Sequence, residues 1–158
     1  MNEDDVILVS QEGQEFKIEY KALKLIPTAH NIVLDSGTGI KVPVPIQGKI
    51  LQKCVEYCQH HANDVKPEQE NKSANPFVFS EWDVDFMKIN VEDHVQLISA
   101  ANYLAIPNLL DLAVKTMAKI LVSKGDPKNI KEFFGVKREF TPEEYEAVRK
   151  ENKWCEER

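Results

Sequence analysis

Apolar and polar residues alternate along the first fifty positions with the periods of strands and then of a helix. Residues 6–10 form a β-branched run, residues 11–13 supply turn residues, and residues 16–20 alternate with period two. We expect these segments to form a β-hairpin. Residues 42–46 are also extended in character, and their two prolines predict an edge position or a short strand.

Two short helices are expected between these strands. Residues 22–26 carry apolar positions at helical spacing, and Pro27 stops that helix. Thr28 is of the residue class that caps helix N-termini, so we expect it to cap a second short helix. Apolar residues 32–34 belong to this second helix, which ends near Gly37.

An amphipathic helix is predicted over about residues 47–61, because apolar residues recur there at three- and four-residue steps. Residues 62–76 that follow are polar, so we expect a mobile, irregular loop. The apolar stripe of the helix consists of Ile50, Leu51, Cys54, Val55 and Cys58.

The second half of the chain contains further helical patterns, each preceded by capping residues. The pattern after Asn90 is apolar nearly all round, so we expect that helix at the centre of the core. A small sheet followed by helices indicates an α+β architecture. The expected helix starts are Ser80, Asn90, Pro107, Asp126 and Thr141.

The last of these helices has a strong start and little to bury. Thr141 suits the N-cap, Pro142 the first helical position, and Glu144 completes a capping box. A terminal helix this polar would fray alone, so we expect a partner outside the chain to complete it. Its thin apolar or semi-polar line consists of Tyr145, Val148, Asn152 and Cys155, with Trp154 beside it.

Composition excludes several classes of function. The chain has 158 residues and a formal net charge of -6, so no basic surface neutralises phosphates and no nucleic-acid partner is expected. No apolar run reaches membrane-spanning length, and the N-terminus lacks the apolar region of a signal peptide. Three cysteines, an odd number, fit a reducing compartment, which predicts a cytoplasmic or nuclear protein.

One cluster has the composition of a metal site, namely Cys54, Cys58, His60 and His61. Both cysteines lie on the apolar stripe, where buried thiols behave as small hydrophobes, so core packing is the preferred interpretation. The sequence contains no motif of nucleophilic, phosphate-binding or metalloprotease chemistry. We therefore expect no catalytic residue, no cofactor and no metal, and an interaction protein rather than an enzyme, with a metal-dependent enzyme ranked last.

Several motifs, collinear over most of the chain, resemble the S-phase kinase-associated (Skp) adaptor family, the small subunit of Skp–cullin–F-box ubiquitin ligases. The closing signature Val-Arg-Lys-Glu-Asn-Lys-Trp-Cys-Glu-Glu covers residues 148–157, after the similar Phe-Thr-Pro-Glu-Glu at residues 140–144. Ala-Ala-Asn-Tyr-Leu at residues 100–104 is similar to the family's central block. Further similar elements are residues 109–111, Lys-Thr-Met-Ala at residues 115–118, the Trp82-Asp83 pair and the Cys58-x-His-His element.

The resemblance implies a BTB/POZ fold over residues 1–122 and two additional C-terminal helices over residues 123–158. It implies a non-catalytic adaptor that bridges a cullin N-terminal region and an F-box protein. Asn102 and Tyr103 would face the cullin. The implied F-box contacts are Leu110, Val114, Met117, Ile120, Ile130, Phe133, Val136, Phe140, Tyr145, Val148, Asn152 and Trp154.

The chain also departs from the family pattern. Residues 36–41 are short and nearly uncharged where the family has an acidic tract, and Ala105 stands where the family favours Asp. Residues 107–108, Gly135 and Tyr145 also differ, in the manner of a divergent paralogue. A cullin-independent scaffold of the same fold is therefore the alternative. The sequence leaves open a homodimer in the absence of partners and any modification of the proline in residues 140–144.

Overall fold

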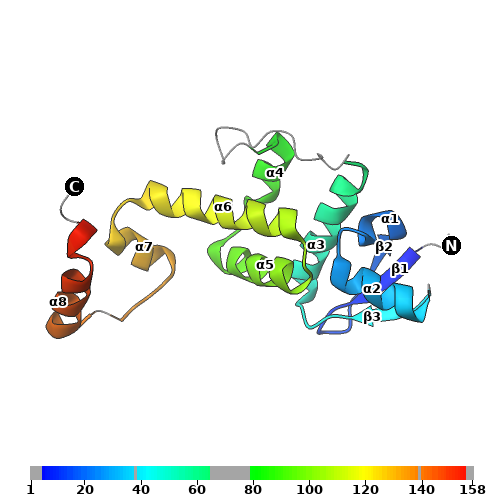
Figure 1. Ribbon diagram of the computed structural model, residues 1–158, viewed down its shortest axis with the longest axis horizontal. Coiled ribbons are helices and arrows are strands. Elements are labelled where there is room, and N and C mark those ends of the chain that lie inside the picture. The colour runs from blue at the N-terminus through cyan, green and yellow to red at the C-terminus, as the bar shows by residue number, and fades with distance from the viewer. Residues whose placement is uncertain (1–4, 38, 65–78, 139, 156–158) are drawn as a thin grey trace. The chain divides into compact units, whose positions relative to one another are not determined.

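The computed structural model describes residues 5–37, 39–64, 79–138 and 140–155 (Figure 1). Two compact units divide the chain: unit 1 is Met1–Ser123 and unit 2 is Lys124–Arg158. The helices are α1 (Tyr20–Leu23), α2 (Pro27–Ser36), α3 (Gly48–His60), α4 (Glu81–Phe86), α5 (Val91–Tyr103), α6 (Pro107–Lys124), α7 (Pro127–Phe133) and α8 (Pro142–Glu151), with 3-10 turns η1 (His61–Asn63) and η2 (Lys153–Cys155).

A three-stranded sheet begins unit 1. Strand β1 (Asp5–Val9) lies in the middle, antiparallel to β2 (Glu15–Glu19) and parallel to β3 (Lys41–Pro43). Alternation places Val6, Leu8 and Ile18 on one fully buried face. The predicted hairpin is confirmed. The proline-rich segment is a short edge strand, as its sequence predicts, because proline cannot donate to a neighbouring strand.

Helix α3 connects the sheet to the helical part of unit 1, because it packs against both β2 and α5. Its apolar stripe is buried as predicted, with Leu51, Cys54 and Cys58 fully inaccessible. Helix α5 contributes Leu97 and Ala101 to the same core, but Val95 is 45% exposed. The expected central helix therefore has one open side.

Most predicted helix starts are confirmed at the level of single hydrogen bonds. Ser80 and Asp83 form a reciprocal capping box on α4, and the Asn90 side chain accepts the Asp93 amide at 2.8 Å on α5. Asp126 caps α7. The strong start of α8 is also present, since the Thr141 hydroxyl accepts the backbone N–H of the third helical residue and the reverse contact closes the box.

Three local expectations need correction. Thr28 does not cap α2: Ile26 is the N-cap residue, Pro27 begins the helix, and the Thr28 hydroxyl donates to the carbonyl of Tyr103 at 3.2 Å. The expected loop starts later than predicted, because residues 61–63 form η1, and most of residues 62–76 lie outside the described residues. Helix α8 ends at Glu151, so the residues after it form a separate turn.

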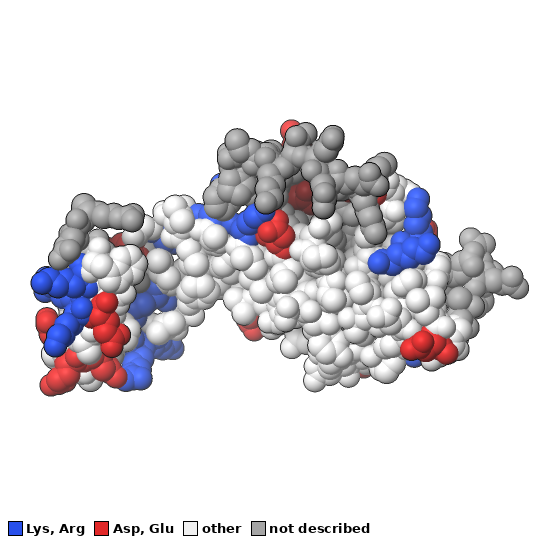
Figure 2. Space-filling view, in the orientation of Figure 1, with Lys and Arg blue, Asp and Glu red and all other residues white. Residues whose placement is uncertain are grey.

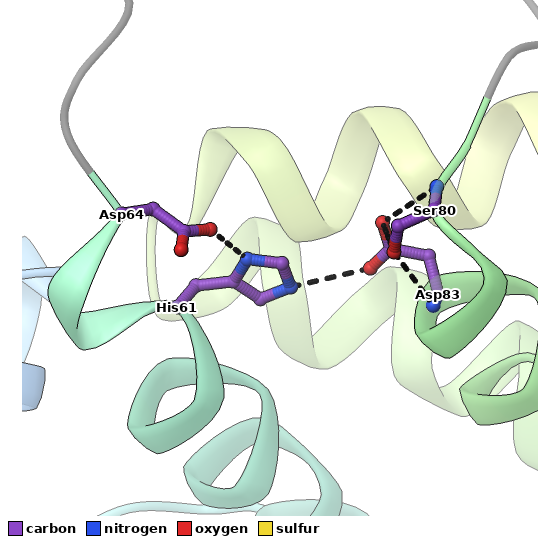
Figure 3. A network of polar contacts seen from close by, with 4 residues as sticks. All are labelled: His61, Asp64, Ser80 and Asp83. Atoms are coloured by element: carbon purple, nitrogen blue, oxygen red, sulfur yellow. Dashed lines mark hydrogen bonds and ion pairs between the residues drawn. The ribbon is translucent and has the colours of Figure 1, made fainter.

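The two histidines of the Cys-x-His-His element join α3 to α4. The His61 ring lies between two carboxylates, with Nδ1 against Asp64 and Nε2 3.2 Å from Asp83, which also closes the α4 capping box with Ser80 (Figure 3). The His60 ring stacks on Trp82 with centroids 3.8 Å apart. These residues therefore hold the start of α4 against the end of α3.

The buried cysteines are part of the hydrophobic core. Burial raises the pKa of the Cys54 thiol to about 12, and it also raises the pKa of Cys58, so both thiols stay protonated at neutral pH. Among the described residues, no group of three or more histidine, cysteine, aspartate or glutamate side chains could hold a metal ion. The histidines after α3 contact α4 instead.

The turn between β1 and β2 fixes the start of α3. The Glu12 carboxylate accepts the backbone N–H of Gly48 at 2.8 Å, and this hydrogen bond holds the pKa of Glu12 below its ordinary value of 4.5. Gly48 cannot be replaced without movement, because an added Cβ would lie 1.9 Å from the Gln14 side-chain oxygen. Two side chains of the turn, Glu12 and Gln14, therefore lie directly against the backbone of Gly48 at the start of α3.

Acid should therefore weaken unit 1 through Glu12. Because the folded pKa is depressed, the contribution of this carboxylate is present above about pH 4.5 and is lost as the pH falls through the folded pKa. We expect Glu12→Gln to lower the urea midpoint at pH 7, and the difference from wild type to shrink as the pH falls below 4.5. A midpoint difference that is constant between pH 7 and pH 3 would contradict this assignment.

Candidate partner-binding surfaces

A groove of about 490 Å³ opens on unit 1 between the β3–α3 corner and α5. Ile46, Gln47 and Ile50 line one side, and Val95 and Tyr103 line the other. Every described residue that lines it is uncharged. In a chain with a net charge of -6, a neutral groove with apolar walls is suited to a partner's apolar side chains.

The two predicted cullin contacts lie at the end of α5, but only one of them lines this groove. Tyr103 is 49% exposed and forms part of the wall. Asn102, the preceding helical residue, is exposed outside the lining. The pair is therefore open to solvent on unit 1, as a docking pair must be.

Sequence reasoning missed the other groove residues, because they come from three separate segments of the chain. Gln11 comes from the hairpin turn, Ile46 from the segment after β3, and Ser99 from the middle of α5. One signal was available: no charged residue occurs between His94 and Asp111. Figure 2 shows the same property as an uncharged area over the α5 region of unit 1.

The C-terminus of α5 is closed by a Schellman motif. The Ile106 amide donates to the carbonyl of Ala101 at 2.9 Å, and the Ala105 amide donates to that of Asn102 at 3.2 Å. Ala105 stands at the left-handed position, with φ of 55°, where glycine is usual. A Cβ there is strained, so the corner beside Tyr103 is held at some cost in stability.

Replacing Ala105 with glycine should stabilise unit 1. Removal of the Cβ relieves the left-handed strain, and after the entropic cost of glycine we expect a gain of about 1 kcal/mol in the free energy of unfolding. Urea denaturation measures it. Ala118→Gly is the matched control, because Ala118 lies inside α6, where glycine should destabilise by roughly 0.5–1 kcal/mol. A loss of stability in Ala105→Gly would contradict the assigned strain.

The first group of predicted F-box contacts lies on one face of α6. The spacing of four, three and three residues places them along one side of the helix. The face is only partly covered: Val114 is 47% exposed, whereas Met117 is buried. The four residues are Leu110, Val114, Met117 and Ile120.

The second group lies in unit 2, whose described residues form no buried core. None of the residues 124–154 whose exposure is described is buried, whereas unit 1 has a continuous core. The residues that stand out are apolar and exposed by 40% or more. They are Phe134, Val136, Phe140, Tyr145, Val148 and Trp154, to which Ile130 and Phe133 add half-buried surface.

Within unit 2, local contacts order the helices without burying them. The rings of Phe133 and Phe134 meet edge to face with centroids 5.2 Å apart. Arg138 pairs with Glu144 at the start of α8. Figure 2 shows acidic and basic side chains mixed over the α8 segment, which has four glutamates and two basic residues, so charges of both signs flank its apolar line.

The end of α8 differs from the continuous helix expected. Asn152 closes the helix, since its backbone and side-chain N–H groups both donate to the carbonyl of Val148, at 3.0 and 2.8 Å. Trp154 follows in η2 and is 67% exposed. The predicted F-box contacts Val148 and Trp154 therefore lie on different elements, with Asn152 at the C-cap between them.

The fold and these surfaces define a class of protein: a small α+β binding module of the BTB/POZ type with a helical C-terminal extension. Comparison with known proteins agrees. The family profile of the Skp1 family tetramerisation domain matches residues 4–63, and that of the Skp1 family dimerisation domain matches residues 107–155. The chain belongs to the Skp1 family, whose members are non-catalytic.

Three relatives illustrate the similarity. SKP1-like protein 1A of Arabidopsis thaliana is 37% identical over 98% of this chain and 99% of its own length. SCF ubiquitin ligase complex protein SKP1b of Dictyostelium discoideum is 36% identical over 97% of this chain and 96% of its own length. Suppressor of kinetochore protein 1 of Schizosaccharomyces pombe is 35% identical over 96% of this chain and 97% of its own length. No helix in the described part of the chain is long and apolar enough to cross a membrane.

Proposed function

We propose that this protein is a non-catalytic adaptor of a Skp–cullin–F-box ubiquitin ligase, which joins a cullin N-terminal region to F-box substrate receptors. The name of the Dictyostelium relative places that protein in such a complex, and the relative is 36% identical to this chain over nearly the whole length. The observation that carries the proposal is unit 2: it has a capped helix and exposed aromatics, and none of its side chains whose exposure is described is buried. Such a surface is completed by a partner.

Each surface has one partner in this proposal. The cullin region docks on the neutral groove of unit 1, with Tyr103 in its wall and Asn102 beside it. The F-box protein covers the α6 face and the apolar line of unit 2. Full burial of one exposed aromatic or branched apolar side chain contributes roughly 1.5–3 kcal/mol, so several such residues offset the ordering cost of unit 2.

Reconstitution tests the proposal. The purified chain is mixed with a cullin N-terminal region and an F-box protein, alone and together, and the products are sized by light scattering after gel filtration. We expect both binary complexes and one ternary complex of equal stoichiometry. A cullin and an F-box protein that compete for the chain would contradict the bridging role.

A second function is favoured by two observations. The profile that matches residues 107–155 is described as a dimerisation domain, and Ala105 alters the corner beside the groove. A scaffold that binds F-box proteins or itself without a cullin is therefore the alternative. Sedimentation of the chain at micromolar concentration, with and without an F-box protein, separates the two: a dimer that persists alongside bound F-box protein, with no cullin binding, favours the scaffold.

A further inference from the structure

One carbonyl at the end of α5 is satisfied from a different helix. The Schellman motif and the preceding helical bond engage the carbonyls of Ala100, Ala101 and Asn102 by backbone amides. The carbonyl of Tyr103 is next in the series, and its partner is the Thr28 hydroxyl, which donates at 3.2 Å. Thr28 therefore completes the cap of α5 from α2.

Thr28 stands on a helix that is itself held firmly, so it can fix the position of another element. It lies in the first turn of α2, whose Ala29 and Val33 are buried in the core of unit 1. The Tyr20 hydroxyl and the His30 ring nitrogen Nε2, 3.2 Å apart, join α2 to α1. The donor thus stands on a helix that is fixed on two sides, and it contacts the carbonyl of the last helical residue of α5.

Among the α5 residues that line the groove, Tyr103 is the one at the helix end. Val95, Ser99 and Ala100 lie inside the helix, where backbone hydrogen bonds on both sides fix them. Tyr103 is the last helical residue, and its backbone depends on the cap. A contact to its carbonyl therefore sets the position of this wall of the groove and leaves the rest of the lining unchanged.

We propose that Thr28 is a positioning residue for the docking groove: it does not line the groove, but its hydroxyl holds Tyr103, and with it Asn102, in the orientation that the cullin region meets. The inference rests on the proposed function of the groove. It also corrects what the sequence suggests for this threonine, whose side chain serves α5 and not its own helix.

The test compares two substitutions in the full-length chain. Thr28→Val keeps the shape and removes the donor, whereas Thr28→Ser keeps the donor. We expect Thr28→Val to weaken binding of the cullin N-terminal region about three- to tenfold by calorimetry, as loss of one hydrogen bond implies. Thr28→Ser should stay within about twofold of wild type. Binding of an F-box protein should not change in either variant.

Ser80→Ala is the matched control, because it removes a hydroxyl that caps α4 and does not line the groove. It should leave cullin binding unchanged. Equal losses of cullin and F-box binding in Thr28→Val would indicate a general structural role and overturn the proposal. Cullin binding at the wild-type level in Thr28→Val would also overturn it.

Amide hydrogen exchange decides the question without a partner. Thr28→Val should speed exchange at Leu104, Ala105 and Ile106, the amides of the α5 cap, relative to Leu97 inside the helix. Unchanged exchange at these amides would overturn the positioning role. If Thr28→Val speeds exchange as expected but the wild-type chain binds no cullin region, the proposed function fails and the role of Thr28 in fixing Tyr103 stands.

Discussion

Removal of residues 141–158 is expected to abolish binding of F-box proteins while unit 1 stays folded. The deletion takes away α8 and the turn after it, with the exposed side chains of Tyr145, Val148 and Trp154. Three apolar side chains of this size account for several kcal/mol of contact on burial. Pull-down with an F-box protein measures the loss, and circular dichroism with urea denaturation checks unit 1.

A point substitution sharpens this prediction. Trp154→Ala should weaken the F-box complex about 10- to 100-fold, because a 67% exposed indole in a partner surface has the character of a hot spot. Lys150→Ala, an exposed α8 residue outside the apolar line, should change affinity by less than about threefold. Retained affinity in the deletion variant would remove α8 from the proposed site.

Tyr103→Lys is expected to abolish cullin binding and to leave F-box binding intact. The substitution puts a charge into the wall of an uncharged groove, where a docked partner would desolvate it. We expect an affinity loss of about 100-fold or more. Asn102→Lys should also lower the affinity for the cullin region, but by less, because Asn102 lies outside the groove lining.

Val84→Lys is the matched control for this experiment. Val84 and Tyr103 are both 49% exposed on unit 1, and Val84 does not line the groove. If both substitutions reduce cullin binding equally, the loss reports general damage to unit 1 and not contact at the groove. Cullin binding by Tyr103→Lys at the wild-type level would assign the docking surface elsewhere.

Short-range sequence signals predicted most of the fold, because their physical causes are local. The capping residue Ser80 was found from its spacing to Asp83, and the stripe containing Cys54 from its helical period. The hydroxyl of Thr28 shows the limit of this approach. It has the local signature of a cap, but a carbonyl 75 residues away in the sequence is its partner. Only the folded chain, which brings Thr28 to the end of α5, decides between them.

Of the two candidate surfaces, one could be predicted from local sequence signals and the other could not. The apolar line of unit 2 is continuous in sequence, so residues such as Phe140 and Trp154 could be selected from the residue pattern and the family resemblance. The groove is assembled from a hairpin turn, a strand exit and a helix, and Gln11 or Ile46 carries no local mark of it. The resemblance supplied Tyr103, and the folded chain supplied its neighbours.

The absence of buried side chains among the described residues of unit 2 has a consequence for the lifetime of the protein. A segment without a core opens at little cost in free energy, and an opened segment is open to proteases. A bound partner closes it by mass action, in proportion to its concentration. Unpartnered copies would therefore be removed first, and the cellular abundance of the chain would follow the supply of its partners without a dedicated regulator.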